Sequence, residues 1–360
     1  MSQPPIVILT PRLDGNAVGR AMVLADLIGG SREVHIAGPH SFPLWTPLAS
    51  RADLNIVGLS ANPLAASRFI SERFPTATFI ASKPLLASFG VALLVRHSRI
   101  LLDIDDPEIA LSTADLRTFL SVILRSQSPV ITASLIAIRD RAGAKTVSNS
   151  LLQARYGGTV VPHARDERLF SEEERDRARA RRALGVSESR RLIVYVGTVR
   201  RHKGIDVLRE AVRMMRHPVE LAIIGGQPSG AAKHEIVQGP VDYRTALLWV
   251  AAADVIAVPQ TDSRASRSQS PAKLGDALAV GRAIVTTRLD VIKEIVGDAA
   301  LLAAPGSARD LSDRLTEVLT DDRLRLRLEA AARDRFETTL SFSVVRPKLL
   351  DVVARLEASS

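Results

Sequence analysis

Cysteine is absent from the chain, aromatic residues are scarce and no apolar run is long, and each of these features excludes a class of protein. Without cysteine there is no disulfide framework, no thiolate metal site and no catalytic thiol, which fits a reducing compartment. No apolar stretch reaches the ~20 residues that a membrane-spanning helix needs, and the N-terminus lacks a signal-peptide pattern. We therefore expect a cytoplasmic protein, and its 360 residues are enough for two ordinary domains.

The chain is basic, with a formal net charge of +9 and an isoelectric point near 10.4. Only 4% of the residues are aromatic, so stacking platforms for single-stranded nucleic acid are scarce. No zinc-finger, RRM or basic-zipper pattern occurs, and the basic excess is spread over both halves of the chain. We therefore expect no nucleic-acid partner, because an anionic ligand, or peripheral contact with an anionic membrane at its inner face, explains the charge at least as well.

Short apolar runs alternate with amphipathic segments in both halves of the sequence. In the first half the runs are Ile6–Thr10, Glu33–Ala37, Leu54–Val57, Thr78–Ala81, Ile100–Ile104, Thr146–Val147 and Thr159–Val161. In the second half they are Leu192–Val196, Glu220–Ile224, Val255–Val258, Ala283–Thr286 and Ala300–Leu302. Helical patterns occupy Ala17–Ile28, Leu116–Arg125, Ile205–Met215, Tyr243–Ala252, Pro271–Val280 and Ala308–Leu319.

This alternation predicts an α/β fold with two Rossmann-like, doubly wound parallel-sheet domains that face a cleft. The charge-dense segment Asp166–Glu188 is interpreted as a linker plus one solvated helix. Ligands of parallel sheets bind outside the carboxyl ends of the strands, so we expect the functional residues to follow the apolar runs.

A strand, a glycine turn and a basic loop follow one another at residues 192–204. The apolar run Leu192–Val196 predicts a strand buried on both faces, and Gly197 ends it. The loop before the next helical pattern then carries a basic cluster, which consists of Arg200, Arg201, His202 and Lys203. Cationic groups and backbone amides at a helix start suit a phosphate group. The alternative interpretation is a solvated basic turn without a ligand.

A second segment suited to an anion begins at Ser270. Serine before proline is a strong helix-start signal, so Ser270 is predicted as the N-cap and Pro271 as the first helical residue. Lys273 then lies in the first turn, where a cation is unfavourable for the helix dipole, and this violation of a local rule suggests a bound anion. Asp276 lies three residues further and could accept hydrogen bonds from hydroxyl groups. The alternative is a capped surface helix with an incidental lysine.

Six segments in a fixed order resemble a known family. They are Asp14–Gly19, Val160–Phe170, Val196–Gly204, Ala253–Pro259, Ser270–Gly281 and Glu294–Asp298. In this order and spacing they are similar to the retaining nucleotide-sugar glycosyltransferases of the GT-B fold, family four (glycosyl transferases group 1). The resemblance implies an acceptor domain at residues 1–165 and a linker with the donor domain at residues 166–343. It also implies that a last helix within residues 344–360 crosses back onto the first domain.

The resemblance implies a donor site mainly in the second domain. Carried over residue by residue, Lys203 would bind the donor diphosphate, and Gly15 would let the backbone approach it closely. The helix start at Ser270 would contribute backbone donors, and Asp276 stands where the family usually has a glutamate for the ribose hydroxyls. The family's nucleobase contacts match Val237–Tyr243. The neighbouring residues expected at the donor are Asn16, Gly197, Thr198, Arg201, Pro271 and Lys273.

Apart from Asp276, the sequence departs from the family pattern at two positions of the donor site. Thr198 stands where an arginine commonly follows the glycine, although Arg200 or Arg201 could supply the guanidinium. The first glutamate of the family's paired-glutamate motif falls at Ser268, and Asp262 could replace it if its loop folds back.

A third departure lies in the first domain, where the usual histidine aligns best with Asp105. This residue lies at the end of a predicted strand, where a carboxylate is expected near a ligand. We expect Asp105 to orient the sugar or the acceptor hydroxyl, with Asp103 on the same side, whereas Asp106 before Pro107 is interpreted as a turn cap. Three acidic residues suggest a metal, but GT-B enzymes generally manage without one, so we expect no metal and no other cofactor.

The resemblance implies retaining transfer from a nucleoside-diphosphate sugar to a hydroxyl acceptor, which is a glycan, a lipid-linked molecule or a small molecule. Because loss of the diphosphate is the slow event, the candidate catalytic residues are Lys203, Arg200 and Asp105. The main alternative is a degenerate, non-catalytic member that binds a nucleotide sugar or a partner enzyme. An epimerase or phosphorylase is disfavoured by missing signatures, and a dinucleotide oxidoreductase by the lack of a G-x-G-x-x-G motif after a strand.

Overall fold

The computed structural model describes residues 3–39, 43–95, 99–112, 128–227 and 234–359 and divides the chain into two compact units. Unit 1 consists of Met1–Ala164 and Val345–Ser360, and unit 2 consists of Arg165–Val344. The domain boundaries expected from the sequence lie one residue away from these. The helix predicted at Leu116–Arg125 lies outside the described residues.

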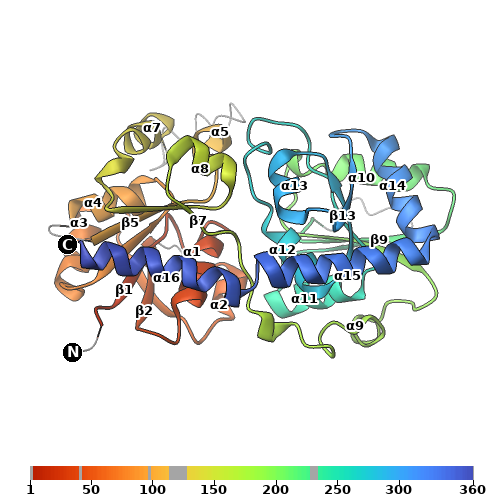
Figure 1. Ribbon diagram of the computed structural model, residues 1–360, viewed down its shortest axis with the longest axis horizontal. Coiled ribbons are helices and arrows are strands. Elements are labelled where there is room, and N and C mark those ends of the chain that lie inside the picture. The colour runs from red at the N-terminus through yellow and green to blue at the C-terminus, as the bar shows by residue number, and fades with distance from the viewer. Residues whose placement is uncertain (1–2, 40–42, 96–98, 113–127, 228–233, 360) are drawn as a thin grey trace. The chain divides into compact units, whose positions relative to one another are not determined.

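Unit 1 is built on a seven-stranded parallel sheet with the strand order β3-β2-β1-β4-β5-β6-β7 (Figure 1). The strands are β1 Ile6–Leu9, β2 Val34–Pro39, β3 Asn55–Leu59, β4 Thr78–Ser82, β5 Arg99–Ile104, β6 Ala144–Val147 and β7 Thr159–Val160. The order reverses where β1 pairs with β4. The carboxyl ends of the strands at such a reversal are where doubly wound sheets bind their ligands.

Helices pack on this sheet, which explains why its central strands are continuous apolar runs. The helices of unit 1 are α1 Val18–Ile28, α2 Thr46–Ala49, α3 Pro63–Arg73, α4 Val91–Leu94, α5 Glu108–Ser112, α7 Pro129–Ala137, α8 Ser150–Tyr156 and α16 Phe342–Ala358. The last helix, α16, returns to unit 1 from the far end of the chain. Its Glu357 accepts hydrogen bonds from Arg32 at 2.9 Å and from Thr78 of β4 at 2.6 Å.

Unit 2 repeats the plan with a six-stranded parallel sheet in the order β10-β9-β8-β11-β12-β13. The strands are β8 Arg191–Val196, β9 Val219–Ile224, β10 Glu235–Gln238, β11 Val255–Val258, β12 Ala283–Thr287 and β13 Ala300–Ala303. The helices are α9 Arg177–Leu184, α10 Ile205–Met214, α11 Tyr243–Ala252, α12 Ala272–Val280, α13 Asp290–Val296, α14 Ala308–Thr320 and α15 Asp322–Thr339.

Strand β8 confirms the prediction of a strand buried on both faces. Leu192 and Val194 belong to a core that contains residues of α11 and α12, whereas Ile193 and Tyr195 belong to a core with residues of α10 and α14. All four side chains are fully buried. The strand therefore leads from the middle of the sheet directly into the glycine turn that follows it.

The sequence patterns do not predict β10, α13 or α15. Strand β10 is a four-residue edge strand, which is too short to give a clear pattern. Helix α15 is rich in charged residues, but four of its buried residues recur every fourth position, and this spacing would have indicated the helix. These residues are Leu324, Leu328, Ala332 and Phe336.

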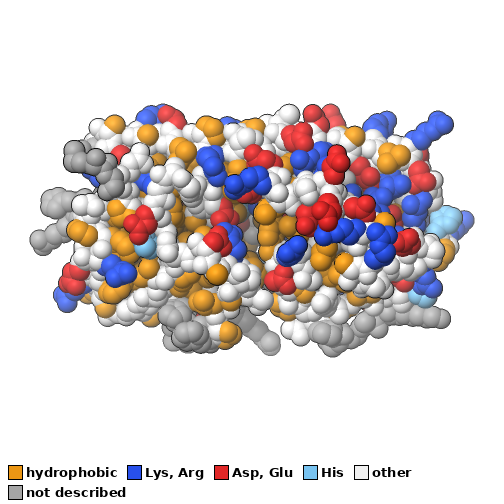
Figure 2. All heavy atoms as spheres, turned by 90° about the horizontal axis from the view of Figure 1, so that it is seen from below, with side chains coloured by type: hydrophobic (Ala, Val, Ile, Leu, Met, Phe, Trp, Pro, Cys, Tyr) orange, Lys and Arg blue, Asp and Glu red, His pale blue; other side chains and the backbone are white. Residues whose placement is uncertain are grey.

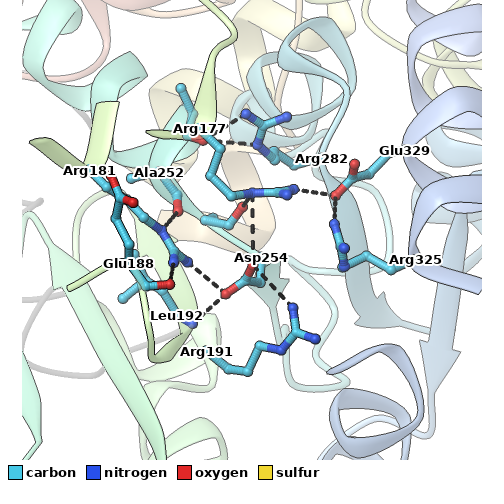
Figure 3. A network of polar contacts seen from close by, with 12 residues as sticks. Arg177, Arg181, Glu188, Arg191, Leu192, Ala252, Asp254, Arg282, Arg325 and Glu329 are labelled. Atoms are coloured by element: carbon cyan, nitrogen blue, oxygen red, sulfur yellow. Dashed lines mark hydrogen bonds and ion pairs between the residues drawn. The ribbon is translucent and has the colours of Figure 1, made fainter. Parts of the chain in front are cut away.

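The segment predicted as a linker with a solvated helix is instead packed into unit 2. Arg181 of α9 is only 4% exposed and donates to the carbonyl oxygen of Ala252 at 2.9 Å and to Asp254 at 2.7 Å (Figure 3). Asp254 also accepts a hydrogen bond from the backbone of Leu192 at 2.8 Å. The dense charge of this segment therefore includes buried ion pairs that join α9 to the sheet, and the prediction of a solvated helix is wrong.

Charged side chains of both signs are interspersed on the face of unit 2 drawn in Figure 2. Exposed helical pairs of opposite sign in this unit include Arg314–Asp310 and Arg333–Glu337. Pairs of this kind contribute only about 0.3–0.5 kcal/mol each. In the part of the chain that the structure describes, no helix has the length and apolar character needed to cross a membrane.

Candidate functional site

Two glycines shape the backbone between β8 and α10. Gly197 has a φ of 131°, and a Cβ atom at this position would lie 2.7 Å from Nζ of Lys273. Gly204 has a φ of 67°, and a Cβ atom there would lie 1.7 Å from the carbonyl oxygen of Pro259. No larger residue fits at either position without moving its neighbours. The backbone of the predicted glycine turn is thus held directly against a lysine side chain.

Lys203 lies in a short 3₁₀ turn before α10, and its Nζ points to the loop that precedes α12. It donates to the amide oxygen of Gln269 at 2.6 Å and to that of Gln260 at 3.3 Å. Both acceptors are neutral, so these two bonds orient the ammonium group without cancelling its charge. The sequence analysis missed both glutamines, because an amide in a loop carries no recognisable pattern.

Lys273 is the most unusual charged residue of unit 2. Its Nζ is screened from solvent and has no hydrogen-bond acceptor in the described part of the chain. The ammonium group lies 3.7 Å from the ring centroid of Tyr195, whose face attracts a cation. Burial and the nearby charge of Lys203 hold the pKa of Lys273 well below its usual range, and Asp276 only partly opposes them. Among the described residues, this buried amine lacks the anionic partner that a buried lysine normally has.

Helix α12 begins one residue later than predicted. Pro271 is its N-cap, with an extended ψ of 103°, and no side chain caps the helix. The prediction that Ser270 caps this helix is therefore wrong. Lys273 nevertheless lies in the first turn of α12, as expected. A lysine at this end of a helix is unfavourable for the helix dipole, as the sequence analysis noted.

The carboxylate of Asp276, expected to hold ribose hydroxyls, is already bound within unit 2. It accepts hydrogen bonds from Arg165 at 2.5 and 3.3 Å and from the hydroxyl of Tyr243 at 2.8 Å. Burial, followed by the charge of Asp276, raises the pKa of Tyr243 well above its usual range. A ribose at this carboxylate would share it with Arg165 or displace one of these bonds.

The remaining donor candidates of unit 2 lie on its surface. Thr198 and Arg200 are exposed, and the side chain of Arg201 lies outside the described residues. Asp262 forms an exposed ion pair with Arg267 at 2.6 Å. Because this exposed pair already engages its carboxylate, Asp262 is a weaker candidate for the place of the missing glutamate than the sequence suggested, and its role there stays a prediction.

In unit 1 a lysine ammonium group lies among three carboxylates. Lys83, which follows β4, donates from Nζ to Asp105 at 2.8 Å, to Asp106 at 2.8 Å and to Glu108 at 2.6 Å. The carboxylate oxygens lie within 4.8 Å of one another, a spacing that a metal ion could also bridge. Because the ammonium group of Lys83 already donates to all three carboxylates, the protein itself supplies the cation that balances them. Asp106 thus belongs to this cluster, although the sequence suggested only a turn cap.

Lys83 has a backbone conformation that is rare for a residue with a side chain, with a φ of 81°. Its backbone nitrogen donates to the carbonyl oxygen of Asp103 at 2.8 Å, and its own carbonyl oxygen accepts from the hydroxyl of Ser88 at 2.6 Å. Such conformations cost about 1–3 kcal/mol and persist where the surroundings fix them. The sequence analysis missed Lys83, because nothing in one sequence marks a positive φ at a lysine.

Asp105 lies at the carboxyl end of β5 and is 3% exposed. Burial raises its pKa to about 7, Asp106 and Asp103 add to this effect, and Lys83 opposes it. The second carboxylate oxygen lies 3.8 Å from Nε2 of His163. A carboxyl group that titrates near neutral pH at a strand end is chemically suited to proton transfer or to orienting a hydroxyl.

The second predicted acidic residue, Asp103, has a different environment. It is completely buried and accepts two hydrogen bonds from Arg20 of α1, both at 2.8 Å, and one from Thr146 at 2.7 Å. Arg20 also donates to the carbonyl oxygens of Val161 and Pro162. The structure thus contradicts a place for Asp103 on the sugar or acceptor side, since its carboxylate joins β5 to α1 out of reach of a ligand.

The early glycine loop is present between β1 and α1. Gly15 accepts a backbone hydrogen bond from Val18 at 3.2 Å, and the carbonyl of exposed Asn16 accepts one from Gly19 at 3.1 Å. A Cβ atom at Gly15 would meet Arg12 at an ordinary distance of 3.5 Å. Packing within the loop therefore does not require glycine, and close approach of a ligand stays the predicted reason for it.

Residues 190–321 match the family model described as Glycosyl transferases group 1. The D-inositol 3-phosphate glycosyltransferase of Xylanimonas cellulosilytica is 30% identical over 193 residues, which is 48% of this chain and 46% of that protein. The chain spans about half the length of the curated relatives it matches. The match to the group 1 glycosyl transferase model thus lies within unit 2 and agrees with the predicted family over that part of the chain.

Solved structures resemble the chain over nearly its full length. Sucrose-phosphate synthase from Thermosynechococcus elongatus has a TM-score of 0.77 and 15% identity and covers 99% of this chain and 100% of its own. HepE of Anabaena, solved in complex with UDP-glucose, has a TM-score of 0.76 and 12% identity and covers 98% of this chain and 100% of its own. At such identities the likeness concerns the fold alone, and it confirms the predicted GT-B class with two parallel-sheet α/β domains.

Proposed function

We propose that this chain transfers a sugar from a nucleoside-diphosphate sugar to a hydroxyl acceptor, with retention at the anomeric carbon and without a metal ion. The observation that carries this function is the buried side-chain nitrogen of Lys273, which has no hydrogen-bond acceptor among the described residues and lies against Gly197. A diphosphate would supply the missing negative charge. The match of residues 190–321 to group 1 glycosyl transferases and the UDP-glucose complex of HepE support this donor class.

Unit 2 would stabilise the leaving diphosphate with charges that are in place before the reaction. Lys203 and Lys273 lie at the carboxyl end of β8, and the starts of α10 and α12 add backbone amides. Preorganised donors act where charge develops in the transition state, and removal of one costs about 100- to 1,000-fold in rate. Exposed Arg200 would add to this charge once the donor is bound.

Unit 1 would bind the acceptor, with Asp105 orienting its hydroxyl group. The lysine held among the carboxylates gives this acidic cluster its own cation, which supports a reaction without a metal or other cofactor. The acceptor class stays open among glycans, lipid-linked molecules and small molecules.

Contact with an anionic membrane is proposed for helix α7 of unit 1. Val130 is 73% exposed and Ile131 is 38% exposed, and basic Arg139 and Arg141 follow the helix. Apolar side chains beside cationic ones suit a membrane interface. Sedimentation with phosphatidylglycerol vesicles, compared with neutral vesicles, tests this contact, and Val130→Ser with Ile131→Ser should weaken it.

The donor assignment is tested by thermal shift with UDP, GDP, dTDP and ADP and their common sugar conjugates. A ligand at ~100 times its dissociation constant adds about 2.7 kcal/mol of stability. One nucleotide should stabilise the wild type and the Lys293→Ala control, in which an exposed lysine of α13 is lost, and should stabilise Lys203→Ala clearly less, because that variant binds it more weakly. No response from the folded wild type would contradict the donor site.

Turnover then separates the enzyme from the non-catalytic alternative. The nucleotide sugar that binds is incubated with candidate acceptors, and the anomeric configuration of the product is read by NMR. Binding without turnover of any donor would favour the non-catalytic member. An inverted product would exclude retention.

A further inference from the structure

The side-chain nitrogen of Lys273 is screened from solvent, and it has no hydrogen-bond acceptor in the part of the chain that the structure describes. Its stem crosses the ring of Tyr195, so that Nζ lies 3.7 Å from the ring centroid. Nζ and Cε lie so close to Gly197 that a Cβ atom there would be 2.7 and 3.0 Å from them. The end of the lysine is therefore enclosed by the glycine turn and the tyrosine, whereas the lysine of unit 1 is enclosed by carboxylates.

The charges around Lys273 disfavour its protonated form. On the β8 side lies the Tyr195 ring, with Arg200 close to it, and the ring face by itself favours the charged form. Burial and the charge of Lys203, which comes from the turn before α10, outweigh it and lower the pKa. The adjacent loop contributes the neutral amides of Gln260 and Gln269. On its own helix, Asp276 is the one acid that affects Lys273, and that carboxylate is held by Arg165 and Tyr243.

We propose, on the basis of the function proposed above, that donor binding in unit 2 is coupled to the uptake of one proton by Lys273. In the free protein the lowered pKa of Lys273 favours the neutral amine, and the diphosphate brings negative charge to it. A unit charge about 4 Å away in a partly buried site shifts a pKa by about three pH units. The amine then captures a proton from solvent and becomes the ammonium partner of the diphosphate, while the donor keeps all its covalent bonds.

This coupling makes donor affinity depend on pH. The phosphates of a nucleotide sugar carry no proton near neutral pH, so a proton taken up on binding belongs to the protein. We expect the dissociation constant of UDP-glucose to rise with pH, by up to tenfold per pH unit, over the range in which the amine is neutral in the free protein and charged in the complex. Despite its burial, Arg165 has a pKa that Asp276 raises above its ordinary value, so Arg165 cannot produce the change.

The experiment is titration calorimetry of UDP-glucose, with GDP-mannose and ADP-glucose in parallel, in buffers of different ionisation enthalpy. The slope of the observed enthalpy against the buffer enthalpy counts the protons. We expect an uptake of about one proton for the wild type and for the Lys293→Met control, and about none for Lys273→Met. Lys203→Met, which removes a neighbouring charge, should reduce the uptake at pH 7 by raising the pKa of Lys273 in the free protein.

Two results would overturn the coupling: binding to the wild type without proton uptake, or equal uptake by folded Lys273→Met. If Lys273→Met does not fold, the proton uptake of Lys203→Met is the test. An uptake equal to that of the wild type would assign the proton to a group other than Lys273 and overturn the proposal. If none of the three nucleotide sugars binds the folded wild type, it is the proposed function that fails.

Discussion

Replacing Lys83 by methionine tests whether the carboxylate cluster of unit 1 depends on its built-in cation. The change keeps the length of the side chain and removes three hydrogen bonds of 2.6–2.8 Å. Breaking a buried ion pair by removing one partner costs about 3–5 kcal/mol, because the other partner stays buried without compensation. For a unit of this size, that loss lowers the melting temperature by about 10 °C.

The loss should depend on pH, and its sign follows from Asp105. In the wild type the pKa of this residue is raised by burial to about 7, above its unfolded value near 4. Folded unit 1 thus binds more protons than the unfolded chain in this window, and the contribution of Asp105 to stability falls as pH rises from about 4 to 7. Without Lys83 the pKa of Asp105 rises further, so the decline extends to higher pH.

The assay is urea unfolding of the wild type, Lys83→Met and the exposed-lysine control Lys348→Met at several values of pH. We expect Lys83→Met to be destabilised most at pH 8 and to recover much of the loss near pH 5, where the carboxylates gain protons. A loss under about 1 kcal/mol, or a loss that is equal at both pH values, would refute the reasoning.

Three further predictions concern the reaction and unit 2. Gly204→Ala should abolish the nucleotide-induced thermal shift, because its Cβ atom would lie 1.7 Å from the carbonyl oxygen of Pro259; an unchanged shift would contradict this geometry. Asp262→Asn should leave donor turnover within about twofold of the wild type, since the exposed pair with Arg267 contributes little, and a loss of tenfold or more would restore the role first expected of Asp262. Chelation with EDTA should not lower donor turnover, and an activity that EDTA removes and Mn²⁺ restores would exclude the metal-independent reaction.

The strands were predictable because parallel sheets with covered faces produce continuous apolar runs. β8 and β11 appear at their predicted places to within one residue. Helix α15 was missed because charged residues surround its apolar ones, and α9 was judged solvated although Arg181 is buried. Composition gives the sign of a charge, but only the fold shows whether a partner such as Asp254 lies within reach.

The glycine turn after β8 was also predictable, because the continuous apolar run of this strand ends directly at Gly197. Partners that are far apart in sequence were not predictable. Asp276 pairs with Arg165, which lies 111 residues earlier, and Asp103 pairs with Arg20, which lies 83 residues earlier. Nothing in one sequence specifies such pairs, so a carboxylate that looks available for a ligand is often already bound.

The two buried lysines at the carboxyl ends of the sheets show how a structural charge differs from a functional one. Lys83 has three carboxylates, which outweigh its burial and raise its pKa well above the usual range, so the fold itself balances this charge. Lys273 has none within hydrogen-bond distance in the described residues, and burial and Lys203 lower its pKa. Both break a local rule, one by a positive φ and the other by its place at a helix start. Because the fold balances the charge of Lys83 and supplies no acid within hydrogen-bond distance of Lys273 in the described residues, Lys273 is where we expect the proposed donor diphosphate to bind.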